Sequence, residues 1–214
     1  PEIDFRLSGF QAVALWLHRA RHVDYDRALS FFLSVVAREG PLYPRPFQEL
    51  CRTFRLDENL VPAMLETFRS HHPALVAYPD FTDFVASHTG RLFLGVITDG
   101  LVEVQQGKID ALGLDRWFDK KAMILTAGTI PPTDKSDPTV FVRAAALAGL
   151  APACCVYVGD NPSRDFQVPR ELGWHTVRAR RGIHSDRASG QDVEVEVPHF
   201  WDLAACLNRL KGAG

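Results

Sequence analysis

The sequence predicts a two-part α/β protein, in which a small helical bundle precedes a doubly wound parallel sheet. Two observations support this division. Residues 1–78 carry apolar side chains at the three-and-four spacing of helices, whereas residues 79–214 alternate short apolar runs with helical segments. Near-continuous apolar runs are typical of parallel strands that are covered on both faces. We therefore expect one domain over residues 1–78 and a second, sheet-containing domain over residues 79–214.

Four helices are expected in the first domain. Ser8 is a suitable N-cap for the first helix, and a second helix spans residues 25–39. A third spans residues 46–54, and Asp57 can cap a fourth. Their apolar residues indicate a packed core rather than a cofactor site, because a single apolar face is what a core-facing helix requires.

The second domain alternates strands with helices. The strands are expected at 92–98, 122–127, 154–158 and 174–179, with an edge strand at 192–197. The helices are expected at 101–112, 138–148, 162–172 and 200–210. Glycines after the first two of these helices, and Asp or Asn before the second and third, provide the stop and start signals. This order predicts a doubly wound sheet with helices on both faces.

The composition excludes several functional classes. The 24 basic and 26 acidic residues give a net charge of -2, which offers no field for binding nucleic acid or an anionic membrane. No apolar stretch reaches the roughly 18 residues of a membrane span, and the first residues lack a signal-peptide pattern. The four cysteines form no CxxC pair and indicate reduced thiols. We expect a cytoplasmic protein that binds neither nucleic acid nor a membrane.

Candidate ligand-binding residues follow the carboxyl ends of three predicted strands, where open parallel sheets bind their ligands. They are Thr98, Asp99, Gly100, Lys135, Asp160 and Asp165. Each has a structural interpretation when taken alone: a hydroxyl bonded to backbone, a solvated lysine, or a carboxylate that caps a helix. Together, a hydroxyl, an ammonium group and two carboxylates suit a phosphate that binds with a divalent cation.

Three segments resemble motifs of the haloacid dehalogenase-like hydrolases, in particular of the phosphatase branch with a helical cap. They are VITDG at 96–100, TDKSDPTVF at 133–141 and VYVGDNPSRDF at 156–166. The resemblance implies a Rossmann-like core, a cap over residues 1–78 and a Mg²⁺ cofactor. It implies that Thr98 and Lys135 are catalytic and that they bind the phosphoryl group together with Asp99 and Gly100. It further implies that Asp160 binds Mg²⁺ and that Asp165 supports the metal shell from a second layer.

The sequence departs from the family pattern at its start. The first motif, DxDx(T/V), supplies the aspartate nucleophile and follows the central strand, and it is not found in this sequence. We expect this motif upstream of Pro1. Without its strand, a gap is expected between strands 92–98 and 154–158. Two smaller departures are KSDP at 135–138, where the family commonly has KP, and Pro169 inside a predicted helix.

The function implied by the resemblance is Mg²⁺-dependent hydrolysis of a small phosphomonoester through an aspartyl-phosphate intermediate. The alternative is a non-catalytic module that binds phosphate or a partner and lacks the nucleophile. A phosphoacceptor receiver domain is disfavoured, because its acidic residues precede the Thr and Lys in the chain. The sequence leaves open the substrate, the cap residues that select it, and the oligomeric state.

Overall fold

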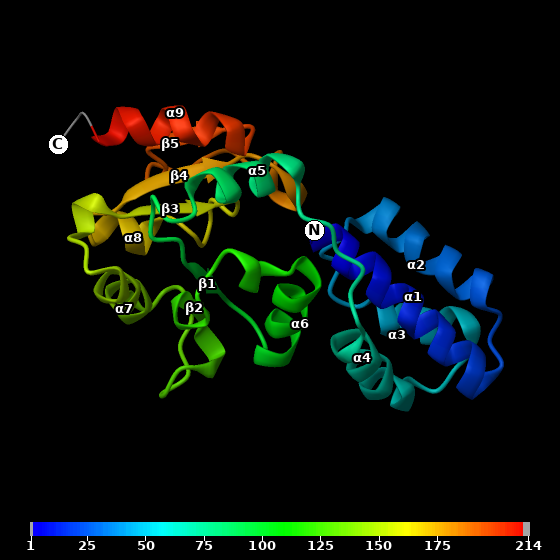
Figure 1. Cartoon of the computed structure of the whole chain (residues 1–214). Helices are drawn as coiled ribbons and strands as arrows, with labels where there is room; N and C mark the ends of the chain where they lie inside the picture. Colours follow the sequence, from blue (N-terminus) through cyan, green and yellow to red (C-terminus); the bar gives the residue numbers. More distant parts are fainter. Residues whose placement is uncertain (1, 212–214) are drawn as a thin grey trace. The chain divides into compact units, whose positions relative to one another are not determined.

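The computed structural model describes residues 2–211 of the chain. The chain divides into two compact units, Pro1–Leu75 and Val76–Gly214 (Figure 1). In its described part the first unit contains helices, and the five strands belong to the second unit. No helix among the described residues is long and apolar enough to cross a membrane.

From residue 2 onward, the first unit is a bundle of four α-helices. They are α1 (Glu2–Arg21), α2 (Tyr25–Glu39), α3 (Pro46–Phe54) and α4 (Val61–Ser70). Its core contains three buried phenylalanines from three of these helices. The ring of Phe10 in α1 stacks on that of Phe32 in α2 at a centroid distance of 4.6 Å, and Phe47 in α3 packs edge-on against Phe32 at 5.8 Å. The helical spacing of apolar residues therefore produces one shared core.

The start of α1 differs from the prediction. Ser8 lies inside α1 rather than at its N-terminus, and its hydroxyl donates hydrogen bonds to the carbonyls of Asp4 (2.9 Å) and Phe5 (3.1 Å). The helix begins earlier because Glu2 and Asp4 place acidic side chains in its first turn, where they oppose the helix dipole. Asp57 caps a short 3-10 helix (Glu58–Leu60) rather than the fourth α-helix: its carboxylate accepts a bond from the backbone N–H of Asn59 at 2.8 Å, whereas α4 begins at Val61 without a side-chain cap.

The described part of the second unit, up to residue 211, contains five parallel strands in two sheets. They are β1 (Val96–Thr98), β2 (Met123–Leu125), β3 (Val156–Gly159), β4 (His175–Ala179) and β5 (Val195–Val197). One sheet has the order β1-β2, and the other has the order β3-β4-β5. Strands β1 and β3 are not paired with each other, which matches the gap that the sequence predicts between them. Strand β1 is shorter than the predicted strand at 92–98, and β3 is offset from the predicted strand at 154–158. Each has a hydrogen-bonded neighbour on one side only.

Helices cover both faces of these strands. They are α5 (Pro79–His88), α6 (Val102–Leu112), α7 (Pro138–Ala148), α8 (Gln167–Glu171) and α9 (Phe200–Lys211). On one face, Phe84 of α5 and Leu203 of α9 pack with Val177 of β4, and Figure 1 shows α5 and α9 along this layer. On the other face, Phe141 of α7 packs with Tyr157 of β3. Strand side chains alternate between two cores, as a doubly wound fold requires.

Helix α8 is much shorter than the predicted helix at 162–172. The carbonyl of Asn161 accepts bonds from the backbone N–H groups of Arg164 (3.2 Å) and Asp165 (3.1 Å), so this stretch forms a turn instead. The helix begins at Gln167, which places Pro169 in its first turn. Proline is tolerated there because no intrahelical N–H donor is needed.

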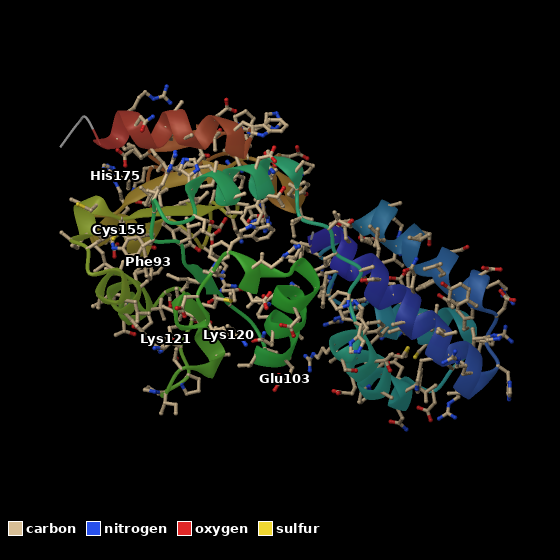
Figure 2. All side chains as sticks on the ribbon, viewed as in Figure 1. Phe93, Glu103, Lys120, Lys121, Cys155 and His175 are labelled. Atoms are coloured by element: carbon tan, nitrogen blue, oxygen red, sulfur yellow. The ribbon has the colours of Figure 1, made fainter. Side chains whose placement is uncertain are left out.

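The amino ends of the strands lie away from the predicted site residues. Figure 2 labels Phe93, which precedes β1, Cys155, which precedes β3, and His175, which begins β4, all along one side of this unit. The backbone N–H of His175 donates to the carbonyl of Cys155 at 2.9 Å, so the pairing of β3 with β4 extends to this end of the strands. The predicted site residues follow the opposite, carboxyl ends of the strands.

Candidate active site

A part-buried ion pair lies at the centre of the candidate site. The Nζ of Lys135, on the loop after β2, is 3.0 Å from Oδ1 of Asp165, on the turn after β3. The side chains are 16% and 5% exposed, respectively. Although 30 residues separate them in the sequence, the fold brings together the third and fourth motif-like segments.

Asp165 also fixes the turn that follows β3. Its Oδ2 accepts hydrogen bonds from the backbone N–H groups of Asp160 (3.2 Å) and Asn161 (2.9 Å). A Cβ atom at Gly159 would lie only 2.6 Å from the same oxygen, so glycine is required there by close approach. Both oxygens of Asp165 are therefore engaged, which suits a role in supporting the turn rather than in binding a ligand directly.

Lys135 carries its positive charge in a mostly buried environment. Its Nζ lies 5.7 Å from the ring centroid of Tyr157. Burial by itself lowers the pKa of Lys135, but interactions with Tyr157 and Asp165 outweigh it and raise that pKa above its ordinary value. Burial also raises the pKa of Tyr157 to about 12. At neutral pH the site therefore contains a charged ammonium group beside a neutral phenol.

Asp160 is a half-buried carboxylate in the same turn. Burial, and next the negative charge of Asp165, raise its pKa, while His184 and Lys135 act in the opposite direction. Among the described residues, no other side chain forms a hydrogen bond or salt bridge with its carboxylate. An anionic group in this position is stabilised by any cation that binds next to it.

The donor set can accommodate a magnesium ion only together with other ligands. Within residues 2–211, no cluster of three or more His, Cys, Asp or Glu side chains could hold a metal ion. Mg²⁺ nevertheless needs few protein carboxylates, since it keeps several waters and binds substrate phosphates. Asp160 fits as one direct ligand, because no other described side chain hydrogen-bonds its carboxylate. Asp165 fits as a support, because its oxygens are already used.

The end of β1 presents a hydroxyl and a sharp turn. The Thr98 hydroxyl donates a hydrogen bond of 2.8 Å to Oε1 of Gln105 in α6. Gly100 has a φ of +121°, and a Cβ atom there would lie 2.7 Å from Nε2 of Gln105. Glycine is thus needed for the chain to leave β1. To bind a phosphoryl oxygen, Thr98 must redirect its hydroxyl hydrogen away from Gln105.

Asp99 connects three segments of the site. Its Oδ1 accepts hydrogen bonds from the Thr126 hydroxyl (2.8 Å) and from the backbone N–H of Lys135 (3.0 Å). Its Oδ2 accepts one from Nη2 of Arg164 at 2.8 Å. Sequence analysis missed Thr126, Arg164 and Gln105. Arg164 lies inside the GDNPSRD segment at 159–165, so its place in that motif-like segment could have indicated it as a site residue. Nothing in the sequence pattern marks Thr126 or Gln105.

Four of the six predicted residues thus form one hydrogen-bonded set in the second unit. Asp99 holds the backbone of Lys135, the side chain of Lys135 pairs with Asp165, and Asp165 holds the backbone of Asp160. Thr98 precedes Asp99 and faces α6 instead. The arrangement offers an ammonium group and a hydroxyl for anionic oxygens, and a free carboxylate for a cation.

Comparison with known proteins identifies the family. A model of haloacid dehalogenase-like hydrolases matches residues 49–173, more than half of the chain. Over 165 residues the chain is 32% identical to the glyceraldehyde 3-phosphate phosphatase of Methanopyrus kandleri, covering 75% of this chain and 69% of the relative. It is 28% identical over 164 residues to the phosphoserine phosphatase of Thermus thermophilus, covering 76% and 64%, respectively.

The fold agrees with this assignment. The HAD-hydrolase YfnB of Bacillus subtilis, solved with bound magnesium, matches with a TM-score of 0.63 and 14% sequence identity, covering 92% of this chain and 91% of that structure. At this identity the similarity concerns the fold alone. From the family model and the first relative together, we conclude that the chain belongs to the haloacid dehalogenase-like hydrolases.

Proposed function

We propose that this protein is a Mg²⁺-dependent phosphatase that hydrolyses a small phosphomonoester metabolite through an aspartyl-phosphate intermediate. The observation that carries the proposal is the part-buried Lys135–Asp165 ion pair, with 3.0 Å between Nζ and Oδ1. It places a fixed positive charge beside the turn of Asp160, at the edge of the sheet where ligands bind. A phosphoryl group carries its charge on peripheral oxygens, so a fixed ammonium group stabilises it most when that charge increases.

Each residue has a distinct role in the proposed reaction. Lys135 binds a phosphoryl oxygen and offsets the negative charge that develops during transfer. The Thr98 hydroxyl donates to a second phosphoryl oxygen after it leaves Gln105. Asp160 holds Mg²⁺, which supplies additional positive charge to the phosphoryl oxygens when it is bound. Asp165 keeps Lys135 and the turn of Asp160 in place through the contacts of its two oxygens.

The proposed nucleophile is an aspartate, and the family resemblance assigns it to a motif ahead of residue 1. Its carboxylate attacks phosphorus and releases the alcohol of the substrate, and water then hydrolyses the aspartyl-phosphate to inorganic phosphate. Assays of this proposal therefore use the full natural chain.

The names of the relatives support a substrate class. Both are phosphatases of small phosphorylated metabolites, one named for glyceraldehyde 3-phosphate and the other for phosphoserine. We therefore propose a phosphomonoester of a few carbons as the substrate. The free carboxylate of Asp160 favours this reaction over dehalogenation, because a cation site is useful for a phosphate and has no evident use for a halide leaving group.

The test is phosphate release by the full natural chain from a panel of phosphomonoesters that includes glyceraldehyde 3-phosphate and phosphoserine. A 2-haloacid in the same buffer tests the dehalogenase alternative. We expect phosphate release that depends on Mg²⁺ and is abolished by EDTA, with no halide release. Asp160→Asn should lower the rate at least about 100-fold at fixed Mg²⁺. Asp115→Asn, which removes the same charge from an exposed position in the 3-10 helix Leu114–Arg116, should leave it unchanged.

Two results would reject the proposal. Halide release without phosphate release would assign the dehalogenase reaction instead. Binding of inorganic phosphate without turnover of any ester would favour the non-catalytic, phosphate-binding alternative. Calorimetric titration with phosphate separates that second case from a protein that does not recognise phosphate.

A further inference from the structure

The side chain of Asp99 is oriented for a role other than phosphate binding. It accepts hydrogen bonds from Thr126, Lys135 and Arg164, and it is 17% exposed. A carboxylate has no hydrogen to donate to a phosphate oxygen and would repel it. We propose that Asp99 is a positioning residue, which fixes the backbone of Lys135 and thereby places the ammonium group for reaction. This inference rests on the proposed phosphatase function and deepens it.

The three donors come from three separate segments of the site. Thr126 follows β2 and is buried, Lys135 lies on the loop beyond it, and Arg164 lies on the turn after β3. One carboxylate can accept all three bonds, because its two oxygens together offer about four acceptor positions. Asp99 is therefore the point at which the carboxyl end of β1 is joined to both neighbouring loops.

The backbone N–H of Lys135 makes its hydrogen bond with Asp99. It donates to Oδ1 at 3.0 Å, and the part of the chain that the structure describes contains no second acceptor for it. The turn around Lys135 is otherwise held locally, by the Asp134 carboxylate on the N–H of Ser136 at 2.7 Å. Removal of the Asp99 carboxylate would leave the Lys135 N–H unpaired and the whole turn without its anchor to β1.

Fixing both ends of Lys135 matters because its side chain is long. Asp165 holds the Nζ end and Asp99 holds the backbone end, at 3.0 Å each. A lysine side chain has about 2 kcal/mol of rotamer entropy to lose, so a backbone that moves allows the ammonium group to sample unproductive positions. Misplacement of a catalytic group by about 1 Å can cost on the order of 100-fold in rate.

The Arg164 contact provides a matched control. Arg164 is 58% exposed, so its ion pair with Asp99 lies largely in solvent and is worth little. Arg164→Gln removes that ion pair but leaves the Asp99 carboxylate on Thr126 and Lys135. If Asp99 acts through the Lys135 backbone, Arg164→Gln should have a far smaller effect than a substitution of Asp99 itself.

The experiment uses the full natural chain with p-nitrophenyl phosphate and Mg²⁺. We compare wild type with Asp99→Ala, Asp99→Asn and Arg164→Gln. We expect Asp99→Ala to lower kcat at least about tenfold with KM within about threefold. The reason is that the variant misplaces the Lys135 ammonium group in the transition state and leaves the interactions that bind the substrate equally in both states unchanged. Asp99→Asn keeps an oxygen acceptor for Lys135 and should recover most of kcat. Arg164→Gln should stay within about threefold of wild type.

Amide hydrogen exchange at Lys135, followed by NMR, gives a readout that does not depend on turnover. Asp99→Ala should accelerate exchange of this amide at least about tenfold, Asp99→Asn should restore most of the protection, and Arg164→Gln should leave it unchanged. If Asp99→Ala does not fold, Asp99→Ser replaces it, because a serine side chain is too short to reach the Lys135 N–H.

Three outcomes separate this inference from the proposed function. A raised KM with unchanged kcat in Asp99→Ala would overturn positioning in favour of substrate contact. Unchanged exchange at Lys135 would also overturn it. If wild type releases no phosphate from any ester, the proposed function fails, and the exchange measurements alone decide whether Asp99 fixes Lys135.

Discussion

Asp80 is expected to make a large contribution to the stability of the second unit. It lies in the first turn of α5, is 4% exposed, and forms a two-pronged ion pair with Arg181, in which Nη1 donates to Oδ1 at 3.0 Å and Nη2 donates to Oδ2. Its Oδ2 also accepts the backbone N–H of Phe200 at 2.8 Å, at the start of α9. Hydrogen bonding to Arg181 lowers the pKa of Asp80 from 3.8 to about 2, against the opposing effect of burial.

This shift sets the magnitude of the predicted effect. At about 1.4 kcal/mol per pKa unit, a lowering from 3.8 to about 2 corresponds to about 2 kcal/mol of stability when Asp80 is ionised. The folded-state pKa is the lower one, so this contribution is complete above the pKa of the unfolded chain. It is lost as the pH falls from about 4 towards about 2. Asp80→Asn should therefore destabilise the protein by about 2 kcal/mol or more at pH 7, and by about 1 kcal/mol at pH 2.5.

The assay is urea unfolding followed by tryptophan fluorescence between pH 7 and pH 2.5. A Trp16→Phe background leaves tryptophans only at positions 117, 174 and 201, so the signal reports on the unit that contains Asp80. Comparing variants at each pH cancels the titration of all other carboxylates. Asp83→Asn, on the exposed face of the same helix, is the matched control and should change the free energy of unfolding by less than about 0.5 kcal/mol.

The reasoning fails if Asp80→Asn costs the same free energy at pH 2.5 as at pH 7. That result would mean that the loss comes from shape or packing, because the ionised form of Asp80 would then contribute nothing. An equal loss in Asp83→Asn would mean that removal of any negative charge from α5 is sufficient.

Three further predictions concern the candidate site. Lys135→Met should destabilise the protein by about 3 kcal/mol, because it leaves the buried carboxylate of Asp165 without its partner; in urea unfolding, addition of Asp165→Asn should recover most of this loss without restoring phosphate release. Asp160→Asn should weaken Mg²⁺ binding at least about tenfold in calorimetric titration, and an unchanged affinity would exclude Asp160 as a ligand. The raised pKa of Tyr157, about 12, means that the unfolded chain releases this proton first, so stability falls as the pH rises from about 10 to about 12. Tyr157→Phe should reduce this alkaline loss by about 2 kcal/mol in urea unfolding, and an identical pH dependence would contradict the assignment.

Much of the fold follows from local sequence patterns. Helices α2, α3 and α7 begin and end at the predicted residues. Aspartate N-caps and glycine C-caps mark both ends of α2 and α7, whereas in α3 only the start is marked, by Pro46. Strands are less exact, since a strand exists only where a neighbour pairs with it. Residues 92–95 are apolar enough for a strand, yet β1 begins at Val96, where its pairing with Met123 begins.

Two of the incorrect helix boundaries have a common origin. Ser8 and Asn161 are both suitable N-caps by residue type, but a cap is needed only where a helix starts. In α1 the helix starts earlier, and after Asn161 the chain forms a turn that Asp165 holds through its side chain. Residue type alone does not reveal a competing hydrogen bond from a residue further along the chain.

The candidate site was predicted as a set of residues, and the structure adds their connections. The order of Thr98, Lys135, Asp160 and Asp165 after strands indicated that their side chains lie at one edge. The sequence could not indicate that Asp99 holds the Lys135 backbone, because that contact spans 36 residues and involves a backbone N–H group. Any residue except proline can provide such a donor, so no residue type marks it.

The same reasoning explains why only one of the two carboxylates that join distant segments of the second unit could be noticed in the sequence. Asp80 and Asp99 each accept hydrogen bonds from distant segments, which is possible because an ionised carboxylate only accepts and offers about four acceptor positions. Asp99 is noticed because it follows Thr98 in a motif. Asp80 lies beyond any motif, and its partners Arg181 and Phe200 are over 100 residues away. A buried acidic residue in such a position is therefore best found from its contacts. Those contacts lower its pKa, and the pH dependence of the free energy of unfolding measures that lowering.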